Sequence, residues 1–371
     1  MYMLSLLLLL TTALLTTAQT LLEAISAVPT LSNFTAFYST NELFASAFFN
    51  NQSLYPITVL VPNDNAFATY LQQTGVSLTD LPPEALLTLI QYHTLVSSLS
   101  KENLTNGGSG SGMTTPTMLV NEQYNNRSVG SALASKYGGP ERSKGQVVFI
   151  SNQNTGSSKR LLLSRQAGSS PASVRSGLSS TVNITALDDD QGLWKGGRFH
   201  IVDGLLTPPA MCKETIRQAS LTSLDRALNR SGLWDALDSS NNVTCLGPSN
   251  DAFNKAANPD QNFTSQELAK ALLFHTLPQV AYSDFLVDGM EFASLQNMTV
   301  RVKVQGEGKE RQIWFNNARV VDANVLTHNG LMHVLDAVMT PLDESNATTS
   351  GTPTLRPTST ASATGATSST A

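Results

Sequence analysis

The feature that most constrains this fold is an eleven-residue stretch that occurs twice in the chain. ITVLVPNDNAF runs from Ile57 to Phe67, and VTCLGPSNDAF runs from Val243 to Phe253. Each copy starts with an apolar, β-branched run that reads as a buried strand, and a proline then stops the strand because proline cannot donate to a ladder. Asparagine or serine follows as a helix N-cap, and an aspartate lies in the first turn, where the helix dipole favours negative charge. Every position has a structural reason, so the stretch predicts a duplicated folding unit.

Two further pairs of motifs follow in the same order. LLTLIQYHTL from 86 to 95 is echoed by LAKALLFHTL from 268 to 277, and both place apolar residues and a histidine on one helical face. GRFHIVDGLLTP from 197 to 208 is echoed by GLMHVLDAVMTP from 330 to 341, and each is a strand-like run around a histidine and an aspartate. Three motifs in one order, repeated, predict two tandem domains with the same fold.

This order of motifs resembles the fasciclin-like (FAS1) domain family, whose members carry a strand–proline box ending in Ala-Phe, a central Tyr-His pair and a closing His-x-[Ile/Leu]-Asp strand. The resemblance covers nearly everything from about residue 20 to 342. The tandem copies with a Ser/Thr-rich tail are most similar to secreted fungal members. The resemblance implies an α+β fold in which each of two tandem FAS1-like domains is a β-sandwich wedge flanked by α-helices.

The resemblance assigns structural roles to the residues that carry the motifs. They are Pro62, Asp64, Phe67, Tyr92, His93, His200, Asp203, Pro248, Asp251, Phe253, Phe274, His275, His333 and Asp336. The second copy departs from the first at two positions, since Gly247 replaces Val61 and Phe274 replaces Tyr92. The loss of the phenolic hydroxyl argues against a shared catalytic role for that position.

The chain divides into four segments on this interpretation. They are a signal peptide at 1–18, a first FAS1-like domain at 19–209, a second FAS1-like domain at 210–342 and a Ser/Thr-rich disordered tail at 343–371. The first domain holds about fifty residues more than the second, including the Gly/Ser-rich stretches 106–112 and 166–180, which we expect to be mobile loops. GQVVFIS and KRLLLS, which lie between these stretches, look like ordinary strands.

The first eighteen residues are typical of a secretory signal. An apolar run from Met3 to Leu10 is followed by small residues and a cleavage site after Ala18. The alternative is a transmembrane anchor, for which the run is too short and too interrupted by threonine. Export also agrees with ten Asn-x-Ser/Thr acceptors for N-glycosylation, at Asn33, Asn51, Asn103, Asn126, Asn183, Asn229, Asn242, Asn262, Asn297 and Asn346.

The chain has only two cysteines, Cys212 and Cys245, and both lie in the second repeat. In an oxidising compartment two neighbouring cysteines usually pair, so we expect a disulfide bond between them; the alternative is two buried free thiols. The tail lacks the hydrophobic C-terminal signal of a GPI anchor. We therefore expect a secreted, extracellular protein that is released or associated with the cell wall, with the vacuole lumen as the alternative location.

No pattern of catalytic, cofactor-binding or metal-binding residues is recognisable in the sequence. His93, His200, His275 and His333 lie in apolar runs without a neighbouring ligand cluster, which favours histidines that satisfy backbone groups at the edge of the core. The acidic run Asp188–Asp190 lacks EF-hand spacing, and no G-x-S-x-G elbow or phosphate-binding glycine loop occurs. We therefore expect no enzyme activity and no cofactor.

The expected function is adhesion, or binding to the extracellular matrix or cell wall. The partners would be polysaccharide or protein, with lipid as a further candidate, and the net charge of −5 argues against nucleic acid. The basic residues in or beside the insertions are candidates to contact anionic polysaccharide; they are Lys144, Lys159, Arg160, Arg165 and Arg175. The alternatives are a structural or lumenal, vacuolar glycoprotein and a hydrolase that acts on the wall.

Overall fold

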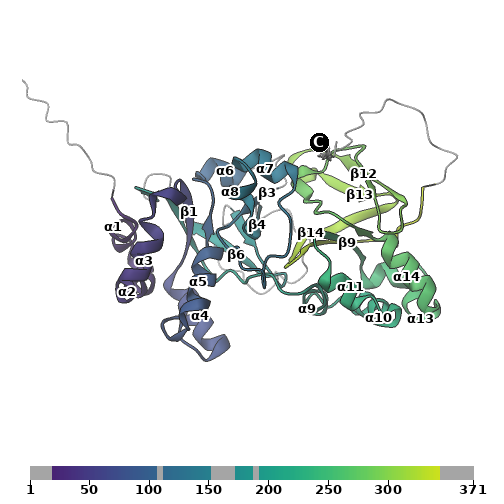
Figure 1. Ribbon diagram of the computed structural model, residues 1–371, viewed down its shortest axis with the longest axis horizontal. Coiled ribbons are helices and arrows are strands. Elements are labelled where there is room, and N and C mark those ends of the chain that lie inside the picture. Colours follow the sequence, from purple (N-terminus) through teal and green to yellow (C-terminus); the bar gives the residue numbers. More distant parts are fainter. Residues whose placement is uncertain (1–18, 107–111, 152–171, 187–191, 343–371) are drawn as a thin grey trace, which may run out of the picture. The chain divides into compact units, whose positions relative to one another are not determined.

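The computed structural model of the chain describes residues 19–106, 112–151, 172–186 and 192–342. Two sheets lie in these ranges, one in each half of the chain (Figure 1). The first contains β1 (Ile57–Pro62), β2 (Thr94–Leu95), β3 (Met113–Pro116), β4 (Val147–Ser151), β5 (Ala172–Arg175), β6 (Thr181–Ala186), β7 (Leu193–Trp194) and β8 (Gly197–Val202). The second contains β9 (Val243–Pro248), β10 (Thr276–Leu277), β11 (Glu291–Ala293), β12 (Thr299–Gln305), β13 (Gln312–Phe315), β14 (Ala318–Thr327) and β15 (Gly330–Leu335).

Helices flank both sheets. Those of the first half are α1 (Leu21–Ser26), α2 (Ser32–Thr40), α3 (Glu42–Phe49), α4 (Asp64–Thr74), α5 (Pro83–Tyr92), α6 (Lys101–Asn106), α7 (Ser131–Tyr137) and α8 (Pro140–Ser143). Those of the second half are α9 (Cys212–Gln218), α10 (Thr222–Ser231), α11 (Trp234–Ser239), α12 (Asn250–Lys255), α13 (Pro259–Asn262) and α14 (Ser265–Phe274). Short 3-10 turns lie at Pro29–Leu31, Gln52–Leu54, Leu78–Asp80, Ser283–Phe285 and Gly308–Glu310.

The two sheets repeat one strand order. It is β2-β1-β8-β6-β5-β4-β3 in the first sheet, with β7 paired to β8, and β10-β9-β15-β14-β13-β12-β11 in the second. The strand of the first motif and the strand of the closing motif are parallel neighbours in both sheets, with Ile57 opposite Gly197 and Val243 opposite Gly330. The repeated sequence motifs therefore meet in space, as the second and third strands in the order of each sheet.

Each sheet curls until its two ends meet. In the first sheet Leu95, at the end of β2, forms an isolated bridge with Thr117, just after β3. In the second sheet the Leu295 amide, just after β11, donates to the Thr276 carbonyl in β10 at 2.8 Å. Each domain is thus a nearly closed sheet with flanking helices, and the predicted α+β fold is confirmed.

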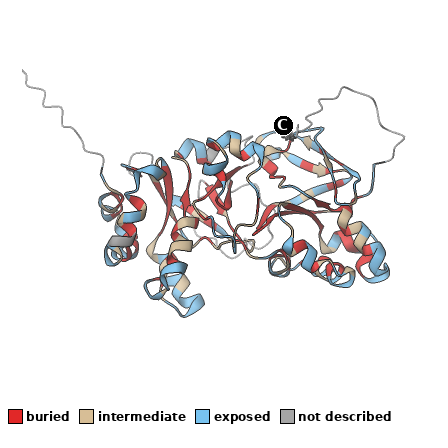
Figure 2. Ribbon diagram, viewed as in Figure 1, coloured by how far each residue is buried: buried red, intermediate tan, exposed pale blue. Residues whose placement is uncertain are grey.

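Both faces of the central strands are buried, because one core lies inside the curled sheet and another lies under the helices (Figure 2). Along β1, Ile57, Val59 and Val61 belong to the core beneath α1–α3, whereas Leu60 belongs to the core that the sheet encloses. Burial on two faces explains why the sequence shows a continuous apolar run here and no alternation.

The predicted strand-to-helix corners form in both copies. The side chain of Asn63 accepts from the Ala66 amide and that of Ser249 accepts from the Ala252 amide, so both cap the helix that follows. The expected capping box at the start of α14 also forms, between Thr264 and Glu267.

The longest insertion in the first domain forms ordered structure. Residues 117–146 connect β3 to β4 and carry α7 and α8, whereas residues 294–298 alone connect β11 to β12. The buried guanidinium of Arg127 donates to the carbonyls of Ser143 and Gly145 and so fastens one end of the insertion to the other.

The stretch 166–180, which the sequence predicts to be a mobile loop, contains β5. That prediction was wrong for residues 172–175, because Ala172 and Val174 face the core inside the sheet and pair with β4 and β6. GQVVFIS contains the predicted strand, as β4. The predicted strand KRLLLS and residues 107–111 lie outside the described residues.

The two domains share a further core. Its buried members are Val96, Leu133, Tyr137 and Val147 from the first domain and Tyr282, Leu326 and Leu331 from the second. At the rim of this core the carboxylate of Asp284 is 1% exposed, accepts from the Thr114 amide at 2.9 Å and lies 3.6 Å from Lys136 Nζ. The insertion therefore supplies much of the contact between the domains, since Leu133, Lys136 and Tyr137 all lie in α7.

Candidate functional site

The two central histidines make the same bonds in both copies. The Nδ1–H of each ring donates to the carbonyl four residues earlier, at 2.9 Å for His93 and 2.8 Å for His275. The Nε2 of each ring accepts a backbone amide just after the closing strand, from Leu206 at 3.0 Å and from Met339 at 2.9 Å. Both nitrogens of each ring are therefore hydrogen-bonded. Each ring joins the helix before it, α5 or α14, to the segment that follows the closing strand, β8 or β15.

The closing-strand histidines repeat a second bond. The Nε2–H of His200 donates to the Leu99 carbonyl at 2.8 Å, and that of His333 donates to the Ala281 carbonyl at 2.8 Å. The Nδ1 of His333 also accepts from the Asn324 amide at 3.3 Å. These histidines hold the loop after β2 or β10 against the sheet, which is the backbone-satisfying role that the sequence favours.

Burial keeps three of these histidines neutral. It lowers the pKa of His93, His275 and His333 to about 4, and the backbone carbonyl bonds oppose this shift only in part. A neutral ring with both nitrogens bonded is a poor acid, base or ligand at pH 7. In the described ranges no three histidine, cysteine or acidic side chains are grouped so that they could hold a metal ion.

The residue before each central histidine is also internal. Tyr92 is fully buried and its hydroxyl donates to the Val147 carbonyl at 3.1 Å, and Phe274 is buried without such a group. Burial raises the pKa of the Tyr92 hydroxyl far above its usual range. The Tyr-His pair is therefore not part of the surface that a partner could reach.

The motif aspartates fasten neighbouring backbone. Asp203 accepts from the Asn183 amide at 2.7 Å, and Asp336 accepts from the Arg319 amide at 2.8 Å, so the two closing motifs are equivalent. At the first corner, Asp64 accepts from the Asn33 amide at 2.8 Å.

The counterpart of Asp64 in the second copy is Asn250, not Asp251. The side chain of Asn250 accepts from the Ser223 amide at 3.0 Å, which is the bond that Asp64 makes to α2 in the first copy. The sequence interpretation missed Asn250 because it matched the two aspartates by type and not by position in the aligned stretch.

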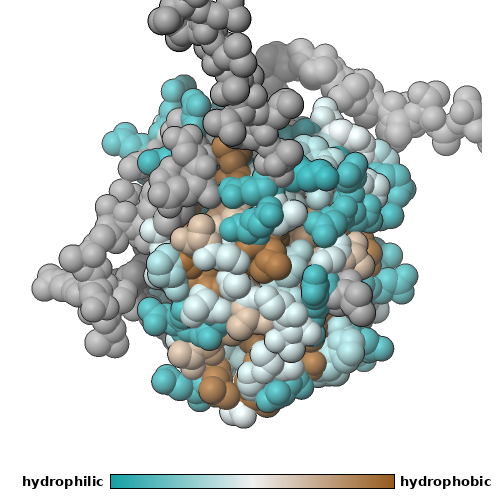
Figure 3. Space-filling view, turned by 90° about the vertical axis from the view of Figure 1, so that its left-hand side faces the viewer, coloured by the Kyte–Doolittle hydropathy of each residue, from teal (hydrophilic) through white to brown (hydrophobic). Residues whose placement is uncertain are grey.

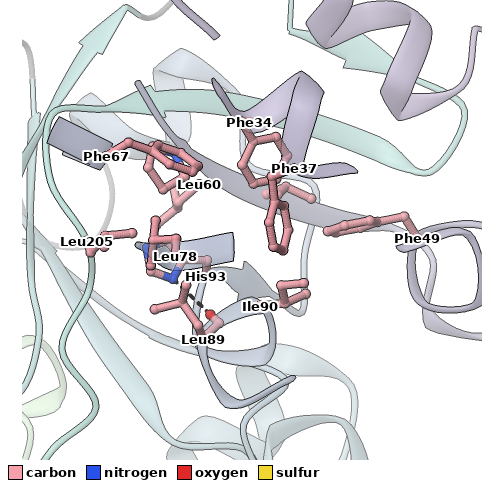
Figure 4. A pocket seen from close by; sticks show the side chains of 12 residues that line it. Phe34, Phe37, Phe49, Leu60, Phe67, Leu78, Leu89, Ile90, His93 and Leu205 are labelled. Atoms are coloured by element: carbon pink, nitrogen blue, oxygen red, sulfur yellow. Dashed lines mark hydrogen bonds between the residues drawn. The ribbon is translucent and has the colours of Figure 1, made fainter. Parts of the chain in front are cut away.

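An apolar crevice lies between the helices and β1 of the first domain (Figure 4). Phe34 and Phe37 from α2, Phe49 from α3 and Phe67 from α4 line it, and the ring of His93 lies at its base. Its free volume is about 20 Å³, which is room for one water molecule. The described conformation therefore does not hold a ready-made site for a small molecule.

The second domain has the equivalent crevice with different walls. Leucines such as Leu224, Leu228 and Leu237 stand where the first domain has phenylalanines, and His275 takes the place of His93. The free volume is about 50 Å³, again too small for a ligand of ordinary size. Because both crevices are this small, a partner would contact the outer surface of the protein.

An open, polar hollow of about 430 Å³ lies on the outside of the second domain. Its lining comes from α9, from the residue before it and from α11, and consists of Met211, Lys213, Glu214, Arg217, Gln218 and Asp238. The Lys213 ammonium and the Arg217 guanidinium lie 5.7 and 5.9 Å from the centre of the Trp234 ring. This group was not predicted from the sequence, although the i, i+4 spacing of the two cations is a usable signal.

The two cysteines are buried free thiols in the structure, in the same apolar core of the second domain. Burial raises the pKa of Cys245 to about 12 and that of Cys212 well above its usual value, and the proximity of Cys245 adds to the shift of Cys212. The structure thus brings the pair together without joining it, and the disulfide bond stays a prediction.

The predicted glycosylation acceptors differ in what their side chains do. Asn33, Asn51, Asn103, Asn229, Asn262 and Asn297 are exposed, whereas Asn126, Asn183 and Asn242 are half-buried and Asn346 lies outside the described residues. The Asn183 amide group donates to Asp203 at 2.7 Å, and Asn242 accepts from the Ser128 amide.

Two of the five basic residues that are candidates to contact polysaccharide are described, and both form ion pairs. Arg175 pairs with Asp322 at 2.5 Å across the two domains, and Lys144 pairs with Glu141 at 2.9 Å. Lys159, Arg160 and Arg165 lie outside the described residues.

Within the described ranges of the chain, no helix is both long enough and apolar enough to cross a membrane.

The repeated motifs define a protein of two similar domains, in which the shared histidines and aspartates hydrogen-bond to backbone groups and so stabilise the fold. Comparison with known proteins gives the family: the Fasciclin domain matches residues 13–137 and 219–341, and the chain belongs to that family. The first match ends with α7, where the insertion interrupts the domain, although the first sheet continues to β8.

Known relatives include fungal proteins. The chain is 26% identical over 205 residues to the fasciclin-like arabinogalactan protein CTB11 of Cercospora beticola, a match that covers 55% of this chain and 53% of that protein. It is 24% identical over 326 residues to the fasciclin-like arabinogalactan protein elcF of Phaeosphaeria nodorum, covering 88% and 89%. The chain thus matches about half the length of the first relative and most of the second.

Among solved structures, a FAS1 domain pair from the insect cell adhesion molecule Fasciclin I matches with a TM-score of 0.36 and 14% identity. The match covers 85% of this chain and 98% of that chain.

Proposed function

We propose that this chain is a non-enzymatic, extracellular glycoprotein that binds polymers of the cell wall or matrix. Two fasciclin domains and the fasciclin-like arabinogalactan relatives support an adhesion-type protein, and the relatives support an extracellular location. The signal-like first eighteen residues and the ten sequons support export and glycosylation.

The observation that carries the proposal is the internal use of the repeated polar residues. Both ring nitrogens of His93 and of His275 are hydrogen-bonded to backbone groups. The carboxylates of Asp203 and Asp336 accept hydrogen bonds from backbone amides. Because these repeated residues bond to the backbone, the outer surface is the part of the protein that remains for contact with partners.

The hollow over Trp234 is the proposed contact, and wall polysaccharide is the proposed partner. It combines two cations and two carboxylates in one open depression, and both cations lie over the buried ring of Trp234. Charged groups at this density can hydrogen-bond many hydroxyls of a sugar chain, and an open hollow admits a polymer that a closed pocket would exclude.

The test is retention of the full-length secreted protein on isolated wall polysaccharides, with wall protein and lipid vesicles as parallel arms. We expect binding to a polysaccharide arm, and we expect Lys213→Glu combined with Arg217→Glu to weaken it at least about tenfold. Lys270→Glu, an exposed change on α14, is the matched control. Retention on no arm would overturn the proposal, and retention on protein or lipid alone would replace the partner.

The hydrolase alternative is tested with the same protein. Release of sugar from the retained polymer, lost on His93→Ala or His275→Ala with the fold intact, would contradict the non-enzymatic proposal. Imaging of the tagged protein in the producing cell separates export from a vacuolar location.

A further inference from the structure

An exposed apolar patch borders one strand of the second domain. Twelve large apolar side chains are exposed among the described residues, and four of them fall within the twelve residues around β11: Val287 (58%), Met290 (37%), Leu295 (44%) and Met298 (37%). We call these four the β11 patch. They flank β11 on both sides in the chain. Exposed apolar side chains that form a contiguous surface mark an interaction site or an aggregation risk.

The strand beside this patch is an edge. β11 is the last strand in the order of the second sheet and pairs with β12 alone. The Leu295 amide just beyond it bonds to the Thr276 carbonyl of β10, but the backbone of Glu291–Ala293 makes no described hydrogen bond on that side. An edge strand with exposed apolar neighbours invites pairing with another chain unless something covers it. In the first domain the corresponding turn is replaced by the insertion 117–146, so only the second domain has this short, bare hairpin.

A glycosylation acceptor lies within the patch itself. Asn297 is at the turn between β11 and β12, with Leu295 and Met298 close to it in the chain, and Thr299 completes the sequon. Its side chain is exposed and makes no hydrogen bond to any described residue, while its backbone turns through a left-handed φ of 57°. The side chain is therefore free to carry a sugar.

We infer that Asn297 carries an N-linked glycan that covers the β11 patch and prevents β11 from pairing with a second copy of the chain. An N-glycan is bulky and solubilising. β11 has three residues and spans about 10 Å, so a branched oligosaccharide attached at one end reaches both ends of the strand. The inference rests on the proposed secretory signal, since only a chain that enters the secretory pathway is glycosylated in this way.

The perturbation should remove the sequon and leave the turn intact. Replacing Asn297 itself would strain the left-handed position, where asparagine is favoured. Thr299→Gln abolishes the sequon and keeps an exposed β12 position polar, and Thr299→Ser keeps the sequon as the matched control. Asn33→Gln removes an exposed acceptor in the first domain, where none of the neighbouring large apolar side chains whose exposure the structure describes is exposed.

The full chain is secreted from a host that adds N-glycans, and three quantities are measured. Glycopeptide mass spectrometry should find Asn297 occupied in the wild type and in Thr299→Ser. Size-exclusion chromatography with light scattering should show Thr299→Gln self-associating, with dye binding to apolar surface raised about twofold, while Thr299→Ser and Asn33→Gln stay unchanged. Adding Met290→Ser and Met298→Ser to Thr299→Gln should restore the monomer.

Two results would overturn the inference: an unoccupied Asn297 in the secreted protein, or a Thr299→Gln variant that remains as monomeric as Thr299→Ser. Neither result depends on wall binding. A protein that fails every wall-binding arm but self-associates on loss of the sequon would refute the proposed function and leave this inference standing.

Discussion

Acid should unfold this protein through histidines that the fold keeps neutral. Burial lowers the pKa of His93, His275 and His333 to about 4 from an ordinary value of 6.5. The unfolded chain therefore binds protons at these sites as the pH falls through 6.5, while the native protein does not until about pH 4. The stability that depends on the neutral rings is complete above pH 6.5 and is lost as the pH falls toward 4.

The magnitude follows from the two pKa values. Between pH 7 and pH 5 each of these histidines should remove about 2 kcal/mol from the free energy of unfolding, because the unfolded ring becomes almost fully protonated and the native ring hardly at all. Three such sites remove about 6 kcal/mol. That is a large fraction of the 5–15 kcal/mol by which typical domains are stable.

The assay is urea unfolding of the full chain, followed by tryptophan fluorescence at pH 7, 6 and 5 and constant ionic strength. This window isolates the histidines from Glu23 and Glu267, whose capping-box hydrogen bonds lower their pKa and move their titration to more acidic pH. His275→Gln is the variant of choice, since glutamine is neutral at every pH and its carbonyl can accept the amide bond now made to Nε2.

His275→Gln should be less stable than the wild type at pH 7, and its free energy of unfolding should fall by about 2 kcal/mol less than that of the wild type between pH 7 and pH 5. The matched exposed change, Lys270→Gln, should leave the pH dependence unaltered. A free energy of unfolding that changes by less than about 1 kcal/mol between pH 7 and pH 5, or that rises, would show that the buried rings are not held neutral.

Three further predictions concern the contact between the domains, the two cysteines and the two closing strands. Asp284→Ala should lower the free energy of unfolding by about 2 kcal/mol in urea titrations, because it leaves a buried threonine amide without its acceptor. Alkylation after denaturation should find no free thiol at Cys212 or Cys245 if they are paired, and reduction should then cost about 3 kcal/mol; two alkylated thiols would refute the bond. Gly197→Ala and Gly330→Ala should each cost about 2 kcal/mol or more by thermal unfolding, since a Cβ there collides with a carbonyl of the neighbouring parallel strand.

The motifs were predictable because each of their residues starts, ends or caps a helix or strand close to it in the sequence. Pro62 ends a strand, Asn63 caps a helix and Thr264 builds a capping box, and the structure contains all three features. Such signals depend on the nearest few residues, so they can be recognised without knowing the rest of the fold. Because the three motifs occur twice in the same order, they could be distinguished from chance matches.

The interface and part of the first sheet could not be predicted in the same way. The segment that carries α7 occurs once, so no second copy marked it as structural, and its partner Asp284 is distant in sequence. β5 was mistaken for a loop because its serine-rich surroundings outweighed Ala172 and Val174, and its burial depends on β4 and β6 on either side. Long-range pairing overrides local composition at such positions.

The duplication also argues that the two domains are unequal as binding modules. The cores of the two domains are similar, because both contain a histidine, a proline and a glycine at matching positions. The outer surfaces of the two domains differ. The hollow of the second domain depends on Lys213 and Arg217 in α9, whereas the equivalent helix of the first domain, Leu21–Ser26, contains no basic residue. A partner that recognises the hollow should therefore engage one domain of each chain, and the first domain contributes by packing α7 against the second and holding it in place.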